Sequence, residues 1–380
     1  MHFYPVNPAS VPSCADCGFL GECGGLEGDA FAQGCFQRCD TYCRLHGCDV
    51  VCPSSPLLVG ELFGDVGGIC VPPRSKLISY DPTDAPVYVP QINNGYRRIE
   101  LLCEPWITVP LYAVAGRDRN QRYQVKFKSG EELRRALRVS PQTKIIITSV
   151  TPDRFIEDFW AEHKVRQIPE QLSALDVTAM TVPNFSFMRD VPRTNSLYNL
   201  SRIFRAAEAI SAAGISTILH LNASTRRDWK RWRDVLREQS HINSICVEFQ
   251  TGTHDREIGD RYFSGLVELQ DSLGRRLHPF ALAGGSRIVD LNANFDSFTI
   301  IDATPFMKTV KYWVLIRIAG GWKSRLYRMK VGASLSNRLK RNIESRRVRF
   351  LQRIGRDALQ PGQQLLPVRS GFNREQFVSR

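Results

Sequence analysis

The chain has 380 residues, 43% of them hydrophobic, with a formal net charge of +13 and a sequence pI of about 9.4. This length can bury a full-sized core, and a (β/α) barrel commonly takes about 250 residues as one domain. The chain begins without a basic region followed by an apolar one, and no apolar run approaches the roughly 18 residues of a membrane-spanning helix. We therefore expect a cytoplasmic protein.

The positive charge is concentrated at the C-terminal end. Residues 323–380 contain fifteen Lys or Arg against three acidic residues, which is +12 of the +13. A cationic segment on a nearly neutral body is typical of a protein that binds a polyanion. DNA or RNA is the first expectation, and an anionic membrane surface is the second.

Eight of the eleven cysteines lie near the N-terminus, among glycines and few large aliphatic residues: Cys14, Cys17, Cys23, Cys35, Cys39, Cys43, Cys48 and Cys52. Such a segment cannot fold on hydrophobic burial alone. In a reducing compartment these thiolates predict a metal site, occupied by Zn²⁺ or by an iron–sulfur cluster. A disulfide-stapled segment is the alternative.

Next along the chain, a Pro-rich stretch at 71–90 predicts a boundary near residue 75, and alternating strands and helices follow it. Apolar, β-branched runs predict strands at 106–114, 144–150, 177–183, 215–222, 242–250, 278–283 and 298–302. Helices are expected at 129–139, 152–162, 195–213, 225–240 and 256–273, with a short one after Gly285. Residues 86–103 could supply one more strand.

Seven strand-then-helix units with long apolar strands predict a parallel sheet, and this number of units favours closure. The predicted fold is a parallel (β/α) barrel of the TIM type. We expect a Cys-rich metal-binding segment at 1–75, the barrel at 76–322, and a basic amphipathic helix and tail at 323–380.

The tail helix carries apolar residues about four apart, with basic residues between them. These basic residues are expected to contact nucleic acid: Arg325, Arg328, Lys330, Arg338, Lys340, Arg341, Arg346, Arg347, Arg349 and Arg353. Helix 225–240 also interleaves basic residues with Trp229 and Trp232, which could stack on bases. The alternative is an outer helix whose tryptophans pack on the barrel.

In α/β barrels the site lies where strands end and loops begin, so polar residues at those positions are the candidates. The expected catalytic residues are Asp302, Glu248, Asp190 and His220. The expected substrate-binding residues are Asn184, Ser186, Asn222, Gln250, Gly284 and Gly285. Carboxylates and an imidazole can transfer protons, and a Gly-Gly turn lets backbone N–H groups approach an anion or a flat base.

Three resemblances add expectations. Residues 177–251, reading VTAMTVPNFSFMRDVPR, then RAAEAISAAGISTILHLNAS, then VEFQTG, resemble an uncharacterised family of bacterial and phage domains. The order Ala283-Gly284-Gly285, short helix, then IIDATPF is similar to the late barrel of tRNA-guanine transglycosylases. In that family a Gly-rich turn contacts the base and a carboxylate after the next strand attacks the sugar. The phrase GCFQRCDTYC resembles the cluster loop of radical-SAM enzymes.

These observations lead to a first hypothesis of an enzyme that binds DNA or RNA and acts on a base in the barrel mouth. Asp302 would be the nucleophile, and Glu248 or Asp190 would transfer the proton. The first alternative is a non-catalytic nucleic-acid-binding assembly factor of a mobile-element or defence complex, with protein partners. The second is an iron–sulfur enzyme. No membrane partner is expected.

Overall fold

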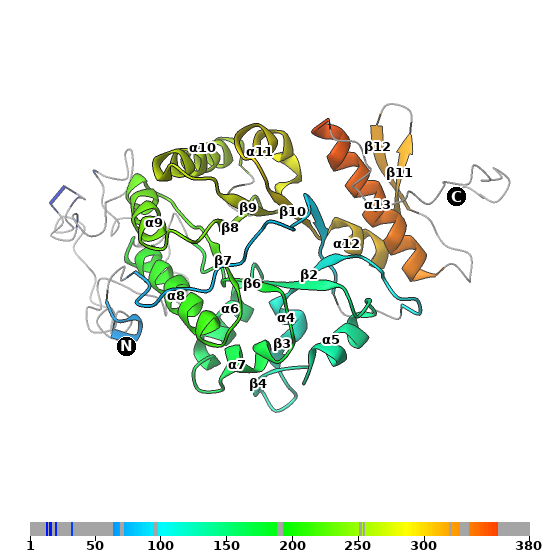
Figure 1. The fold of residues 1–380 in the computed structure, drawn as a ribbon, viewed down its shortest axis with the longest axis horizontal. Coiled ribbons are helices and arrows are strands. Elements are labelled where there is room, and N and C mark those ends of the chain that lie inside the picture. Colours follow the sequence, from blue (N-terminus) through cyan, green and yellow to red (C-terminus); the bar gives the residue numbers. More distant parts are fainter. Residues whose placement is uncertain are drawn as a thin grey trace.

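The computed structural model describes residues 64–68, 72–93, 98–187, 193–250, 255–318, 321–326 and 334–355, together with a few single residues. Its centre is an eight-stranded, all-parallel sheet that curves into a barrel (Figure 1). The strands are β1 (Tyr88–Pro90), β2 (Trp106–Pro110), β5 (Lys144–Thr148), β6 (Ala179–Thr181), β7 (Thr217–His220), β8 (Ser244–Glu248), β9 (His278–Leu282) and β10 (Thr299–Asp302). The expected parallel α/β barrel is confirmed.

The barrel closes between β1 and β2. Neighbouring strands follow the order β1-β10-β9-β8-β7-β6-β5-β2, and every pairing within it is parallel. The two end strands meet through a parallel bridge between Gln91 and Thr108, where Ile92 N–H donates to the Thr108 carbonyl at 2.9 Å. Closure leaves few unpaired strand edges and directs all strand C-termini to one mouth.

Helices surround the sheet as an outer layer (Figure 1). They are α5 (Gly130–Leu137), α6 (Asp153–Glu162), α7 (Ile168–Ser173), α8 (Arg193–Ala212), α9 (Arg226–Glu238), α10 (Arg256–Leu273), α11 (Ile288–Asn294), α12 (Thr304–Val310) and α13 (Leu335–Arg353). Side-chain caps begin several of them: Ser129 accepts from Glu132 N–H, and Thr225 and Asp228 form a reciprocal capping box. Such caps satisfy donors that a helix start leaves unpaired.

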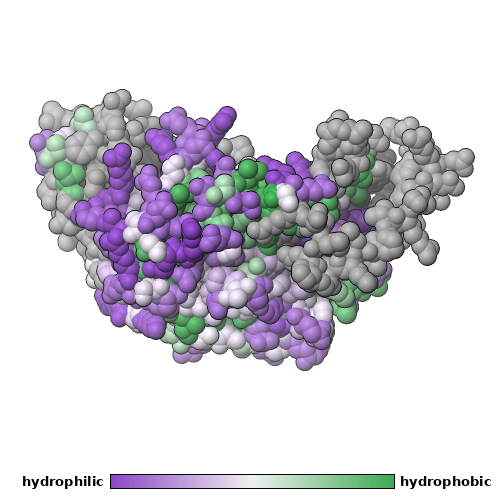
Figure 2. All heavy atoms as spheres, turned by 45° about the horizontal axis from the view of Figure 1, so that its top comes forward, coloured by the Kyte–Doolittle hydropathy of each residue, from purple (hydrophilic) through white to green (hydrophobic). Residues whose placement is uncertain are grey.

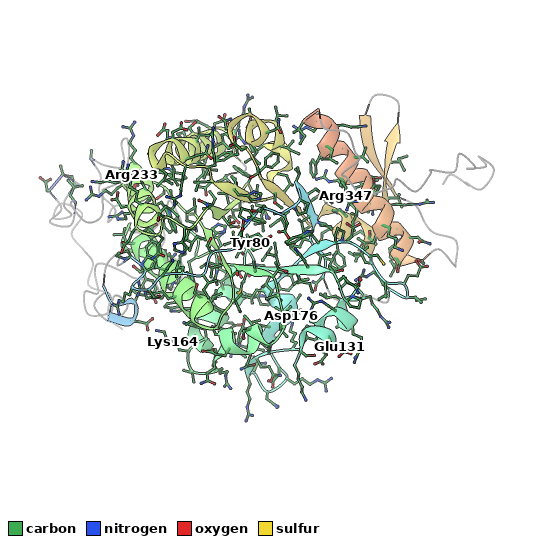
Figure 3. All side chains as sticks on the ribbon, viewed as in Figure 1. Tyr80, Glu131, Lys164, Asp176, Arg233 and Arg347 are labelled. Carbon is green, nitrogen blue, oxygen red and sulfur yellow. The ribbon has the colours of Figure 1, made fainter. Side chains whose placement is uncertain are left out.

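Tyr80 closes the N-terminal end of the barrel and lies near the centre of the view in Figure 3. Its ring packs edge-on against Trp106 and Phe280, with centroids 6.3 and 5.8 Å apart. All three belong to the apolar cluster that fills the barrel interior. Ser79, next to it, bridges to Thr217 at the start of β7. Because this end is filled by packed side chains, access to polar interior groups is from the opposite mouth.

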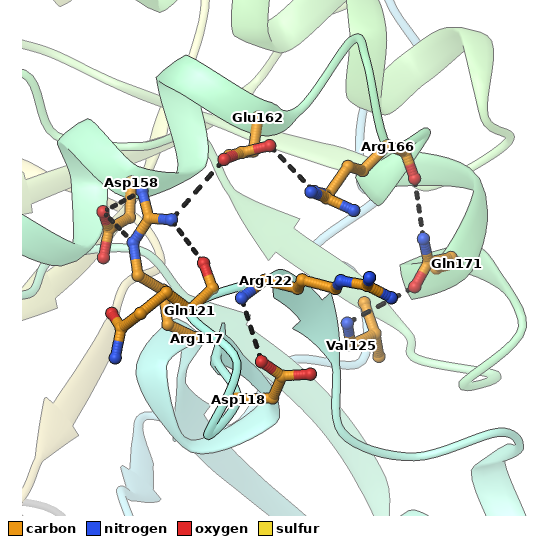
Figure 4. A network of polar contacts seen from close by, with 9 residues as sticks. All are labelled: Arg117, Asp118, Gln121, Arg122, Val125, Asp158, Glu162, Arg166 and Gln171. Carbon is orange, nitrogen blue, oxygen red and sulfur yellow. Dashed lines mark hydrogen bonds and ion pairs between the residues drawn. The ribbon is translucent and has the colours of Figure 1, made fainter.

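The strand predicted at 106–114 is shorter in the structure. The strand stops at Pro110, a short helix α4 (Leu111–Val114) follows, and β3 (Ala115–Arg117) pairs antiparallel with β4 (Tyr123–Val125). Polar contacts tie this hairpin to α6 and α7 (Figure 4): Arg117 lies 2.8 Å from Asp158 and 3.5 Å from Glu162. These ion pairs are partly exposed, so each contributes only about 0.2–1 kcal/mol.

A second hairpin, β11 (Trp313–Ile318) with β12 (Gly321–Leu326), precedes α13 and was not predicted. Asn342 of α13 is fully buried beside it, accepts from Leu315 N–H at 2.8 Å, and donates to Thr309 Oγ1 at 2.9 Å. One amide therefore joins α12, β11 and α13.

Helix α13 belongs to the outer layer of the barrel. Its Phe350 packs on Tyr88 of β1, with ring centroids 5.7 Å apart. Arg347, labelled in Figure 3, pairs with Glu104 in the loop before β2. The sequence predicts a boundary between barrel and tail at residue 323. In the structure, α13 nevertheless packs directly against the barrel.

The face in Figure 2 is mostly hydrophilic, with apolar residues gathered in its upper middle. Exposed apolar side chains include Val289 on α11 and Met307 on α12. Scattered apolar residues of this kind are normal on a folded domain. Among the helices that the structure describes, none has the length and apolarity needed to cross a bilayer.

Candidate active site at the barrel mouth

Glu248, Asn184 and Asn222 come together at the C-terminal mouth. Glu248 is the last residue of β8, and the two asparagines follow the neighbouring strands β6 and β7. Parallel strands end at one edge, so polar residues just after them converge. Three of the residues expected from the sequence therefore form one cluster.

A directed chain of amide hydrogen bonds leads to the Glu248 carboxylate. The Trp232 indole donates to the Asn222 carbonyl at 2.8 Å, which fixes the backbone after β7. The Asn222 amide donates to the Asn184 side-chain oxygen and to the Phe185 carbonyl. The Asn184 amide nitrogen is thereby turned to donate to Glu248. The two asparagines thus orient the carboxylate.

Glu248 is a carboxylate without a cationic partner among the described residues. Burial raises its pKa to about 7, the hydrogen bond from Asn184 lowers it, and the nearby charge of Asp153 raises it. Glu248 is half-buried, and a carboxylate largely removed from water without a counter-ion is costly and is typical of functional positions. At neutral pH the group is divided between its protonated and ionised forms, which suits a proton donor or acceptor.

His220 lies in the barrel interior, at the end of β7, with none of its surface exposed. Burial lowers its pKa to about 3, against a smaller opposite effect of the adjacent Asn222. Asn222 lies near the ring but without hydrogen-bond geometry, and within the described residues neither ring nitrogen has a partner. The imidazole is therefore neutral at physiological pH. Its one N–H could donate a hydrogen bond, but the ring is not in the charged form that serves as a general acid.

Asp153 is a candidate that the sequence analysis missed. It begins α6, three residues after the predicted strand 144–150, is exposed, and interacts electrostatically with Glu248. Ser186, expected as substrate-binding, lies within 3.5 Å of an Asp153 carboxylate oxygen. The sequence does contain a signal for Asp153, because this residue follows the C-terminal end of a predicted strand, as the other candidates do.

The remaining residues near β8 have separate roles. Gln250 is exposed beyond the strand end. The Thr253 hydroxyl donates to the Glu248 carbonyl at 3.0 Å, and the Tyr262 hydroxyl donates to the Leu221 carbonyl.

Trp229 packs on Tyr262, and Trp232 is fully buried against Phe204. These tryptophans therefore pack on the barrel, as the second interpretation of helix 225–240 expected.

The structure does not bring Asp302 together with Glu248. Along β10, Ile301 faces the barrel interior and Ile300 faces the outer layer. Alternation places Asp302 on the outer face, where Arg346 Nε–H donates to its Oδ2 at 2.6 Å. Its other oxygen accepts from Thr304 N–H at 3.0 Å.

Gly284 and Gly285 are also explained by packing. A Cβ on Gly284 would come within 2.6 Å of the Ala281 Cβ, and one on Gly285 within 2.7 Å of the Phe350 ring. The turn therefore has close neighbours from β9 and α13.

The basic residues of α13 divide into groups. Arg338 is buried and donates to the Thr309 carbonyl at 3.1 Å, and Arg347 pairs with Glu104 and Glu344. Lys340 and Arg341 are exposed. Arg346, Arg349 and Arg353 lie near the ends of β9 and β10. The Arg325 side chain, Arg328 and Lys330 lie outside the described residues.

The N-terminal cysteines and Asp190 also lie outside the described residues. In the part of the chain that the structure covers, no group of three or more His, Cys, Asp or Glu could hold a metal ion. The Zn²⁺ or iron–sulfur expectation therefore stays a prediction.

Fold and mouth together define the class: a (β/α)-barrel protein with a carboxylate at its C-terminal end that amides orient and that has no cationic partner among the described residues. Comparison of the chain with models of known protein families and with curated proteins finds no match. The resemblances of residues 177–251 and 283–306 therefore stay predictions.

Proposed function

We propose that the protein is a barrel enzyme that breaks or exchanges the glycosidic bond of a nucleotide base, with Glu248 as the general acid and base. The single observation that carries this proposal is the Glu248 carboxylate itself: oriented by Asn184, without a described cationic partner, at the mouth of a closed barrel. Protonation of the leaving base is the step that such a group can supply.

In the proposed reaction, protonated Glu248 donates to a nitrogen of the base while the bond between that base and C1′ of the sugar breaks. Water, or an incoming base, then adds at C1′ and its proton returns to the carboxylate. Asp153, the second carboxylate at the mouth, would stabilise the positive charge that develops on the sugar.

Asp302 has a different role here from the one that the sequence predicted. Asp302 is bound by Arg346 and faces α13, so it is assigned a positioning role in place of that of the nucleophile. Support for a nucleic-acid or nucleotide substrate comes from the charge of +13 and from the basic residues of α13. DNA and RNA are both included.

The test is release of free base from nucleotides and from single- and double-stranded DNA and RNA, followed by chromatography. Glu248→Gln should reduce release by at least about a hundredfold, because a general acid contributes roughly that much or more. Glu238→Gln, the same change at an exposed site on α9, is the matched control. No release from any of these substrates by the wild-type protein, or equal rates in Glu248→Gln, would contradict the proposal and favour a non-catalytic binding protein.

A further inference from the structure

Three arginines on one stripe of α13 gather at the C-terminal end of the barrel, on its outer side. Arg346, Arg349 and Arg353 are spaced three and four residues apart, so they project from one side of the helix. Arg346 binds Asp302 at the end of β10, and Arg353 donates to the Gly285 carbonyl just after β9. These contacts place the stripe beside the last two strand ends.

The positive charge in this cluster exceeds the negative charge. Asp302 is the carboxylate that interacts with these arginines, and its Oδ2 lies 2.6 Å from Nε of Arg346. Arg349 makes no hydrogen bond or ion pair with any described residue. Burial and the charges of Arg346 and Arg353 lower the Arg349 pKa, whereas Asp302 raises it. Like charges held this close favour an anion that would neutralise them.

The strand to which the cluster is bound, β10, lies two strands from β8 and Glu248. Glu248 lies level with Leu282 in the β8–β9 register, and Leu282 lies level with Ile301 in the β9–β10 register. Two strand spacings separate Glu248 from β10, which is roughly 10 Å. A nucleotide with its base at Glu248 would therefore have to extend its phosphate past the ends of β9 and β10 to meet the arginines.

We propose that Arg349 and Arg353, with Arg346 held in place by Asp302, form a phosphate-binding site for the nucleotide substrate. The link to a substrate rests on the proposed function, whereas phosphate binding itself does not. Arg guanidinium groups suit phosphate because their N–H donors match pairs of phosphate oxygens. A free nucleotide and a nucleic-acid backbone present the same group.

The experiment is calorimetric or NMR titration of the full-length protein with adenosine 5′-monophosphate, adenosine, inorganic phosphate and a short single-stranded oligonucleotide. Arg349→Gln should weaken binding of the monophosphate by at least about tenfold, the loss of one charge-assisted contact. Arg135→Gln makes the same change at an exposed position on α5, outside the proposed site, and should bind as the wild type does. Arg349→Gln should fold normally, because it relieves repulsion among the arginines.

The probes separate the sources of the phosphate. A loss confined to the oligonucleotide identifies a nucleic-acid backbone, and a loss with the monophosphate identifies a nucleotide. Unchanged binding of every phosphate probe in Arg349→Gln, or equal affinity for adenosine and its monophosphate, overturns the site. Glu248→Gln should keep phosphate affinity. Arg349-dependent binding without Glu248-dependent base release would therefore reject the proposed function and leave the phosphate site standing.

Discussion

The Nε–H of Arg346 donates to Oδ2 of Asp302 at 2.6 Å, and both side chains are largely buried. This ion pair connects the last residue of β10 to α13, and the Arg346 guanidinium also lies 4.4 Å from the centroid of the Phe350 ring. The carboxylate expected to attack a substrate is thus part of the contact that holds the basic helix against the outside of the barrel.

Asp302→Asn should lower the free energy of unfolding by about 3 kcal/mol, because it leaves the partly buried Arg346 without its counter-charge. Chemical denaturation measures this change. Pairing it with Arg346→Met in a double-mutant cycle should recover part of the loss. A variant of wild-type stability that has lost base release would instead support Asp302 as the nucleophile.

Glu248 should make stability depend on pH. Its folded-state pKa of about 7 lies above the ordinary 4.5, so the folded protein keeps a proton that the unfolded chain releases between these values. Stability from this group therefore falls as pH rises through that window. Glu248→Gln should be about 2 kcal/mol more stable than the wild type at pH 8 and nearly equal at pH 4. Equal differences at both pH values would show that the carboxylate titrates normally.

Asn184→Ala should raise the pKa of Glu248 further, by about one unit, because it removes the hydrogen bond that favours the ionised form. NMR titration of carbon-13-labelled glutamate carboxyl groups measures the shift. Asn199→Ala changes an asparagine that donates to the Ser186 carbonyl in the same loop, and it serves as the control. A downward shift in Asn184→Ala would contradict the amide chain.

His220 should lower stability in acid. The folded protein keeps the ring neutral down to a pKa of about 3, whereas the unfolded chain takes up a proton below 6.5, so stability falls as pH drops below 6.5. His220→Leu should therefore gain about 1–2 kcal/mol relative to the wild type between pH 7 and pH 5, measured by denaturation. Loss of stability at both pH values with turnover intact would indicate a packing role.

Asn342→Leu should cost about 2–4 kcal/mol, because it leaves the buried Leu315 N–H and the Thr309 hydroxyl without this partner. Hydrogen exchange of the β11 amides should become faster. Asn337→Leu, at an exposed position on the same helix, should change the free energy of unfolding by no more than about 0.5 kcal/mol. It should also leave the exchange of the β11 amides unchanged. Unchanged β11 exchange in Asn342→Leu would mean that the hairpin is held by other contacts.

Local patterns in the sequence predicted most of the barrel. Apolar β-branched runs such as those before Glu248 and Asp302 marked the strands, and Ser129 and Thr225 marked helix starts. These signals are local, because strand burial and capping depend on neighbours in the chain. The break at Pro110 and the β11–β12 hairpin were missed, since a continuous apolar run does not reveal where the chain leaves the sheet.

For the site, the sequence by itself determined that Asn184, Asn222 and Glu248 follow neighbouring strands, and parallel strands bring such residues to one mouth. Only the tertiary structure decided which side chains point inward. Asp302 ends its strand as Glu248 does, but one step of alternation turns its carboxylate to the outer face, where Arg346 binds it. That partner comes from a helix 44 residues later in the chain, so no local pattern could have identified it.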